Sequence, residues 1–275
     1  MKKIFILSCW RSGTSWLEDM LGKKVEGSRL FGHEQQILTF LAMSKKCFYD
    51  NSLNIRRKAN KPLCDIDKKD FYEEFGMKQH KILSNTYKWT KLDFRTFALK
   101  MVETFTLPYE ARKYKQMVEK SPENGSPEVF NCAIEIFSNT KDFNLVYLVR
   151  DFRPYLASCH RKFVRKGKNS LGYYSKKWLQ WNTNAINTLK DNKANNIFIL
   201  SYEDLVKDPS LVEHFCEVWK TNTEVRANVL TKWETSPIIE DINKLYNQNL
   251  TGIKAVEDFV KKRKIIHINK KKGGI

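Results

Sequence analysis

The sequence predicts an α/β protein with three layers, in which helices cover both faces of a central, mainly parallel β-sheet. Short apolar runs rich in Val, Ile and Leu recur along the chain, as in strands that are buried on both faces. Segments whose apolar residues have helical spacing alternate with these runs. Strands that alternate with helices are joined by right-handed crossovers, which make the strands parallel.

The expected strands are short and the helices between them are longer. Strands are predicted at residues 3–8, 116–119, 144–149 and 196–201, with a further one just before the segment 30–35. The run Asn-Leu-Val-Tyr-Leu-Val at 144–149 is the clearest of these. Helices are predicted at residues 14–21, 128–137, 154–164 and 175–189. Gly22 is a suitable end for the first helix.

No repeat or low-complexity linker divides the chain, so residues 1–275 are predicted to form one domain. Between about 41 and 110 the alternation gives way to charged helical segments, which we interpret as an insertion over one edge of the sheet. A basic tail is expected from about 261 to 275.

The net charge of +18 is unusually positive. It has two explanations: a bias toward Lys and Asn throughout the chain, or an anionic partner. That partner could be a polyphosphorylated nucleotide, an acidic glycan, nucleic acid or a membrane surface. The charge alone does not decide among them. The oligomeric state cannot be read from the sequence.

The cysteines and the N-terminus indicate a reducing compartment. No two of the six cysteines have the close spacing of a metal-binding pair, so reduced thiols and no metal are expected. The apolar run before Cys9 is too short for a signal peptide and Arg11 follows it at once, so it is interpreted as a strand. The sequence contains no run of 18 apolar residues, so no membrane anchor is expected. A cytoplasmic location is therefore expected.

The first polar loop follows the first predicted strand and opens a helix. It reads Arg11, Ser12, Gly13, Thr14, Ser15, Trp16. Ligands of parallel sheets bind at the carboxyl ends of strands. There, first-turn N–H groups, hydroxyl groups and a guanidinium together suit a phosphate. The alternative is a simple helix cap, because Ser and Thr favour helix starts.

This loop differs from the phosphate-binding loop of kinases and ATPases. That motif is Gly-x-x-x-x-Gly-Lys-[Ser/Thr], in which the lysine reaches the β- and γ-phosphates. Here Thr14 follows Gly13, and Ser8 stands where the first glycine is required. A triphosphate with Mg²⁺ is therefore disfavoured, and a kinase-like phosphotransferase is kept as an alternative.

The second polar cluster follows the strand at 144–149. Arg150 leaves that strand, and Ser158 lies one to two turns into the next helix, so both can face one point near the sheet end. A guanidinium and a hydroxyl group at that point suit a second phosphate. A surface ion pair between Arg150 and Asp151, beside a helical serine, is the alternative.

Together these residues resemble the sulfotransferases that use 3′-phosphoadenosine 5′-phosphosulfate. The loop 11–15 is similar to the family's 5′-phosphosulfate loop, and Arg150 and Ser158 match its 3′-phosphate pair. The segment 198–209 matches a third family motif, whose tyrosine, Tyr202 here, can reach the cofactor.

The resemblance covers about residues 3–34 and 115–210. The first residue of the loop is an arginine, Arg11, rather than a lysine. In this respect the loop resembles that of tyrosylprotein and of bacterial or carbohydrate sulfotransferases more than that of the cytosolic phenol and steroid enzymes.

The resemblance implies a fold similar to that of P-loop nucleotide-binding proteins. It also implies transfer of a sulfuryl group to a hydroxyl acceptor. Glu34, which lies 23 residues after Arg11, is expected to be the general base, and His33 is the second choice. Lys120 is expected to assist the leaving oxygen, as a lysine does in several family members. Lys162 is expected to add to the 3′-phosphate site.

A carbohydrate is the favoured acceptor, bound by the insertion and the C-terminal helices. A non-enzymatic module for nucleic acid or another anion is the remaining alternative. It is disfavoured because neither a known helix motif nor aromatic residues among basic stripes are found. Trp178 and Trp181 are interpreted as core residues rather than as a platform for adenine.

Overall fold

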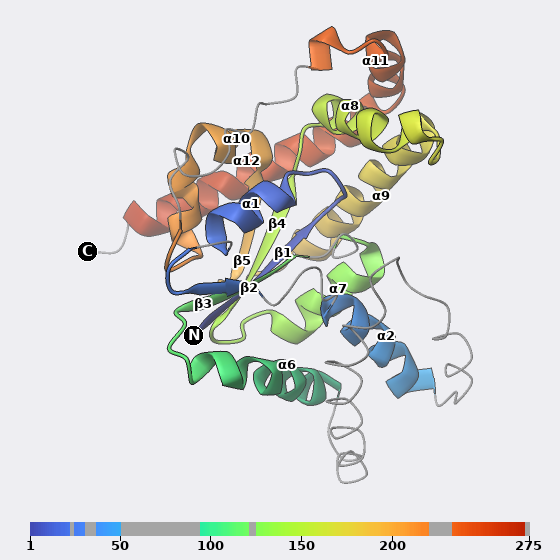
Figure 1. Cartoon of the computed structure of the whole chain (residues 1–275). Coiled ribbons are helices and arrows are strands. Elements are labelled where there is room, and N and C mark those ends of the chain that lie inside the picture. Colours follow the sequence, from blue (N-terminus) through green and yellow to red (C-terminus); the bar gives the residue numbers. More distant parts are fainter. Residues whose placement is uncertain (23–24, 31–36, 51–93, 121–124, 220–232, 273–275) are drawn as a thin grey trace.

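The computed structural model describes residues 1–22, 25–30, 37–50, 94–120, 125–219 and 233–272 (Figure 1). Its centre is a five-stranded parallel sheet with the strand order β2-β3-β1-β4-β5. The strands are β1 (Lys2–Ser8), β2 (Ser28–Leu30), β3 (Gln116–Lys120), β4 (Phe143–Val149) and β5 (Ile197–Ser201). The prediction of an α/β fold with a central parallel sheet is confirmed.

Helices connect the strands and continue beyond the last of them. The α-helices are α1 (Thr14–Leu21), α2 (Ile37–Asp50), α6 (Phe94–Glu110), α7 (Pro127–Phe137), α8 (Phe152–Lys162), α9 (Leu171–Leu189), α10 (Tyr202–Lys207), α11 (Ile239–Gln248) and α12 (Leu250–Lys272). Short 3₁₀ helices are η3 (Val164–Lys166), η4 (Pro209–His214) and η5 (Trp233–Thr235). Within the described residues, no helix has both the length and the apolar composition needed to cross a membrane.

Some boundaries differ from the predicted ones because of local capping. Helix α8 begins two residues before Pro154, since a proline fits in a first turn, whose N–H groups have no partner within the helix. Helix α9 begins at Leu171 because the Ser170 hydroxyl accepts a hydrogen bond from the backbone N–H of Tyr173. Helix α12 continues to Lys272, so the basic C-terminal run is helical almost to its end.

Alternate side chains of β1 enter two cores on opposite faces of the sheet. Phe5 and Leu7 belong to the larger core, which includes residues of α2, α6, α7, α8, α9 and α12. Ile4 and Ile6 belong to the smaller core, which α1, α10 and η4 cover. The described ends of the predicted insertion, α2 and α6, therefore pack in the larger core.

Gln116, the first residue of β3, links this strand to the end of α1 and to the segment after η4. Its Nε2 donates to the carbonyl oxygens of Leu21 and Val218, both at 2.7 Å. Its Oε1 accepts from the backbone N–H groups of Glu217 and Val218, at 2.9 and 3.2 Å. The side chain is completely buried. The Leu21 carbonyl oxygen also accepts from Ser28 Oγ at 2.6 Å, so the loss of Gln116 would act mainly on the backbone groups of residues 217 and 218.

We predict that Gln116→Ala lowers the free energy of unfolding by about 2–4 kcal/mol, because each buried polar group left unpaired costs about 1–3 kcal/mol. Urea denaturation measures the change. Gln180→Ala, on the exposed side of α9, is the matched control and should change stability by less than about 0.5 kcal/mol. Equal effects of the two substitutions would contradict the structural role of Gln116.

Candidate functional site

The segment between β1 and α1 makes a tight turn at the carboxyl end of the central strand. Arg11 and Gly13 both have positive φ angles, of 61° and 90°. A Cβ atom on Gly13 would lie 2.2 Å from two ring atoms of Tyr202, so the turn requires glycine there. Gly13 is the N-cap residue of α1 and has no side chain to satisfy the first-turn N–H groups.

Ser12 supplies a further indication of an anion site in this turn. Its side chain is only 1% exposed, and its Oγ makes no hydrogen bond to any residue that the structure describes. Buried hydroxyl groups nearly always have a partner. A hydroxyl donor beside a helix N-terminus with positive partial charge fits a phosphate oxygen.

Arg150 connects this turn to the end of β4. Its Nη1 donates to the carbonyl oxygen of Arg11 at 2.9 Å. The Nε of Arg11 in turn donates to Ser158 Oγ on α8 at 3.0 Å. The structure thus brings together the three residues that the sequence analysis had placed in two separate anion-binding clusters.

The guanidinium of Arg150 is buried among groups that hold its orientation. Its Cζ lies 4.9 Å from the centroid of the Tyr202 ring, which is a cation–π contact. The indole Nε1 of Trp178 donates to the Arg150 carbonyl oxygen at 3.0 Å. Burial lowers the pKa of Arg150, and the positive charges of Arg11 and Arg161 lower it further. Electrostatic attraction to Tyr202 and Glu203 acts in the opposite direction and raises the pKa of Arg150.

Glu203 is the buried acid beside Arg150. Its Oε1 lies 3.9 Å from Arg150 Nε, and its Oε2 accepts from the backbone N–H of Asp151 at 3.2 Å. Burial first, and then the nearby Asp151 carboxylate, raise the pKa of Glu203 to about 7. The carboxyl group therefore changes charge near neutral pH.

The remaining residues of the first motif and the tyrosine lie around this cluster. Thr14 and Ser15 form the first turn of α1. Trp16 is buried and meets the Tyr202 ring edge-on, with 5.8 Å between the ring centroids. Tyr202 itself is 2% exposed, so its ring packs against the loop and leaves little surface for a ligand.

Lys120 is the last residue of β3, where it pairs with Ile6 of β1 and is largely buried. It therefore stands at the carboxyl edge of the sheet, beside the strand that leads into Arg11. Gly125 approaches the same edge closely, since a Cβ atom there would lie 2.0 Å from the carbonyl oxygen of Ser8.

The structure also bears on the predicted roles of Lys162, the two candidate bases and the two tryptophans. Lys162 is exposed at the end of α8, while its neighbour Arg161 is near enough to Arg150 to affect its pKa. Glu34 and His33 lie outside the described residues. Trp178 and Trp181 are buried in the larger core, as expected.

The sequence analysis missed two charged residues and one role. Glu203 and Arg161 carry no signal of their own, because acids and arginines on short helices are common at surfaces. The hydrogen bond from Trp178 to the Arg150 backbone could not be inferred from a helical spacing that only indicates burial. The resulting arrangement is a mainly cationic cluster at the sheet edge, in which Arg150 is buried and Arg11 and Arg161 are exposed, and it is suited to holding anionic groups in fixed positions.

Comparison with known proteins bears on the family and the fold. A family model described as "Sulfotransferase family" matches residues 3–214. A search of curated proteins found no significant match.

Among solved structures, the sulfotransferase from Alicyclobacillus acidocaldarius is similar with a TM-score of 0.50 and 12% identity, covering 93% of this chain and 95% of that one. The sulfotransferase domain of the Synechococcus PCC 7002 olefin synthase has a TM-score of 0.49 and 16% identity, with 89% and 93% covered. The sulfotransferase domain from the curacin biosynthetic pathway has a TM-score of 0.48 and 18% identity, with 89% and 96% covered. At 12% identity, the likeness to the Alicyclobacillus acidocaldarius sulfotransferase bears on the fold alone.

The raised pKa of Glu203 predicts a pH-dependent stability. Between its ordinary pKa of 4.5 and about 7, the folded protein holds a proton that the unfolded chain releases. Stability therefore falls as the pH rises through this window. Relative to Glu203→Gln, which cannot ionise, the wild type should lose on the order of 1–3 kcal/mol between pH 4.5 and 7.5.

Urea denaturation at several pH values measures this difference. Glu213→Gln changes an exposed glutamate on η4 and should show no comparable trend. A constant difference between wild type and Glu203→Gln across the range would show that Glu203 is ionised alike in both states.

Proposed function

This chain belongs to the sulfotransferase family, and on that premise we propose that it sulfates a carbohydrate hydroxyl group with Glu34 as the general base. As a member of the family it is an enzyme that uses 3′-phosphoadenosine 5′-phosphosulfate. The observation that supports the proposed site most strongly is the hydrogen bond from Arg150 to the Arg11 carbonyl oxygen. It joins two segments that each suit a phosphate.

We assign the two ends of the donor nucleotide to these two segments. The 5′-phosphosulfate would be held by Arg11, Ser12 and the N–H groups of the first turn of α1. The buried Ser12 hydroxyl, which has no hydrogen-bond partner among the described residues, fits this assignment. The 3′-phosphate would be held by Arg150 and Ser158, whose hydroxyl already accepts a hydrogen bond from Arg11.

The proposed reaction is an in-line displacement at sulfur. The acceptor oxygen forms a bond to sulfur while the bond from sulfur to the bridging oxygen of the 5′-phosphate breaks, and that bond's electron pair goes to the phosphate oxygen. The acceptor proton passes to the Glu34 carboxylate, with His33 as the alternative base. The products are a sulfate ester and adenosine 3′,5′-bisphosphate.

The residues around the leaving group would act by stabilising charge. Arg11 and the first-turn N–H groups of α1 oppose the negative charge that develops on the 5′-phosphate. We assign the same role to Lys120, because it ends β3 beside the strand that leads into this loop. Tyr202 acts as a support, since its ring packs on Gly13 and under Arg150.

A carbohydrate acceptor is supported by two features of the sequence. Arg11 at the first position of the loop is closer to the carbohydrate-type branch of the family. The net charge of +18 would favour the approach of an acidic or already sulfated chain. A small alcohol, a lipid or a peptide tyrosine would bring the same hydroxyl chemistry, and a screen of acceptors with labelled donor separates these possibilities.

Arg150→Gln is predicted to weaken binding of adenosine 3′,5′-bisphosphate by about 10- to 100-fold, because a charge-assisted hydrogen bond contributes about 1.5–3 kcal/mol. Thermal shift and titration calorimetry measure the effect. Arg112→Gln, which removes an exposed arginine, is the charge-matched control and should bind normally.

The same thermal-shift assay tests the alternatives. The bisphosphate should raise the melting temperature of the wild type, while ATP with Mg²⁺ and oligonucleotides should have little effect at equal concentration. Stabilisation by ATP with Mg²⁺ would favour a kinase-like protein, and stabilisation by oligonucleotides alone would favour a nucleic-acid-binding module.

Glu34→Gln should retain the affinity for the bisphosphate but lower kcat by about 100- to 10,000-fold, because proton removal is lost while the charge-stabilising groups remain. Single-turnover sulfation with labelled donor measures this, and His33→Gln is the matched comparison. Near-normal turnover in Glu34→Gln together with a large loss in His33→Gln would assign the base to His33.

A further inference from the structure

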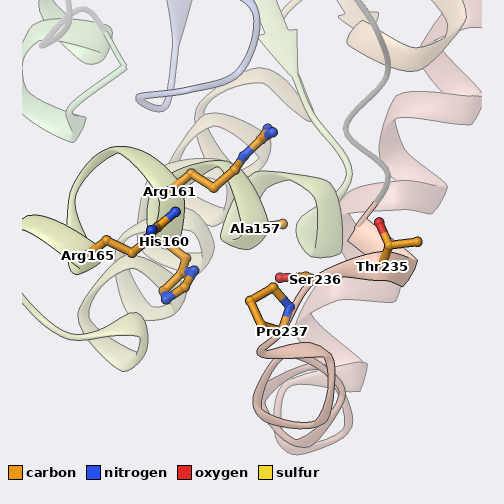
Figure 2. Close-up of a pocket in the computed structure, with 7 residues that line it drawn as sticks. All are labelled: Ala157, His160, Arg161, Arg165, Thr235, Ser236 and Pro237. Atoms are coloured by element: carbon orange, nitrogen blue, oxygen red, sulfur yellow. The ribbon is translucent and has the colours of Figure 1, made fainter.

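A small pocket lies beside the Arg150 cluster, between α8 and the segment that leads into α11 (Figure 2). Its volume is about 230 Å³. The lining residues are Ala157, His160, Arg161, Arg165, Thr235, Ser236 and Pro237. Three of these seven residues are basic and none is acidic. Figure 2 shows the basic side chains on one wall and Thr235 to Pro237 on the other.

The two walls of the pocket are held together by a stacked arginine. Arg153, in the first turn of α8, has its Cζ 3.7 Å from the centroid of the Tyr246 ring and 4.9 Å from that of Trp233. Trp233 begins η5 and Tyr246 lies on α11. These two cation–π contacts connect η5 and α11 to α8 and so hold the two walls of the pocket together.

The pocket opens on a different side of α8 from the proposed donor site. Successive residues of an α-helix point about 100° apart, so Ala157 in the pocket and Ser158, which contacts Arg11, lie on adjacent sides of the helix. Arg161 lies between the two sides, since it lines the pocket and also influences the pKa of Arg150. The pocket is thus a neighbour of the donor site with its own set of side chains.

The chemistry of the lining selects an oxyanion. The guanidinium of Arg165 can donate two parallel hydrogen bonds to a sulfate, phosphate or carboxylate group. The hydroxyl groups of Thr235 and Ser236 can donate from the opposite wall. The surrounding surface attracts anions as well, because six of the nine residues from 160 to 168 are basic.

We propose that this pocket binds a sulfate, phosphate or carboxylate group, and that this group is carried by the acceptor. Its identity as part of the acceptor rests on the proposed function, whereas anion binding itself does not. The donor nucleotide has two phosphate-bearing ends, and each already has its own residues in the site. One wall of the pocket also begins the C-terminal helices, where the acceptor is expected to bind.

Inorganic sulfate is the first probe. Backbone amide NMR signals of Thr235 and Ser236 are followed while sodium sulfate replaces sodium chloride at constant ionic strength, with adenosine 3′,5′-bisphosphate kept saturating. We expect saturable shifts in the wild type. Arg165→Gln should weaken sulfate binding at least about tenfold, as expected for the loss of a charge-assisted contact. Lys168→Gln removes an exposed basic side chain outside the pocket and should leave sulfate binding unchanged.

Three results would overturn the proposal. The first is the absence of saturable shifts in the wild type, and the second is equal sulfate affinity in Arg165→Gln and Lys168→Gln. The third is sulfate binding that occurs only without the bisphosphate, because it would assign the pocket to the donor. If the bisphosphate does not bind at all, the proposed function fails, and the sulfate titration without it still tests the pocket.

A comparison of a sulfated and an unsulfated sugar tests whether the pocket binds the acceptor. A disaccharide that carries one sulfate ester and its unsulfated counterpart are each titrated into the bisphosphate-saturated protein. The sulfated sugar should shift Thr235 and Ser236 and bind at least about tenfold more tightly, and Arg165→Gln should remove that preference. Equal binding of the two sugars would show that the pocket takes inorganic anions but not the acceptor.

Discussion

Arg150 leaves β4 with a buried guanidinium and donates to the carbonyl oxygen of Arg11 across the end of the sheet. A buried charge is costly unless other groups compensate it. Here the compensation comes from that carbonyl, the face of Tyr202 and the carboxyl group of Glu203. Because the same tyrosine ring packs against Gly13, the turn after β1 and the arginine after β4 are positioned together. The two segments that we propose to bind anions are therefore parts of one site.

The parts of the fold that were predictable from the sequence are those with a local pattern. The apolar runs of β1 and β4 and the helical stripe of α1 were found to within one residue, because burial on both faces or on one side leaves a regular spacing. Strand β2 has only three residues, too few to show a pattern. The start of α9 depends on the Ser170 cap, a single contact that no periodicity reveals.

The sequence predicted the main phosphate-binding candidates of the site but not the residues that pack around them. Arg11, Arg150 and Ser158 follow strands that end at one edge, so strand order alone brings them near each other. Glu203 gains its raised pKa from burial and from Asp151, and both depend on how β5 and α10 pack beside β4. The pocket near Arg165 needs η5, which lies 68 residues further along the chain and is held by Arg153. Packing between segments this far apart in the chain cannot be inferred from the spacing of residues in the sequence.

The central claim is that one cluster grips both phosphate-bearing ends of a single adenine nucleotide. Titration calorimetry with adenosine 3′,5′-bisphosphate, adenosine 5′-monophosphate and adenosine 3′-monophosphate tests it most directly. Two joined anion sites predict that the bisphosphate binds at least about 100-fold more tightly than either monophosphate, because each charged contact contributes separately. If one monophosphate binds as tightly as the bisphosphate, only one of the two segments contacts the nucleotide and the account is contradicted.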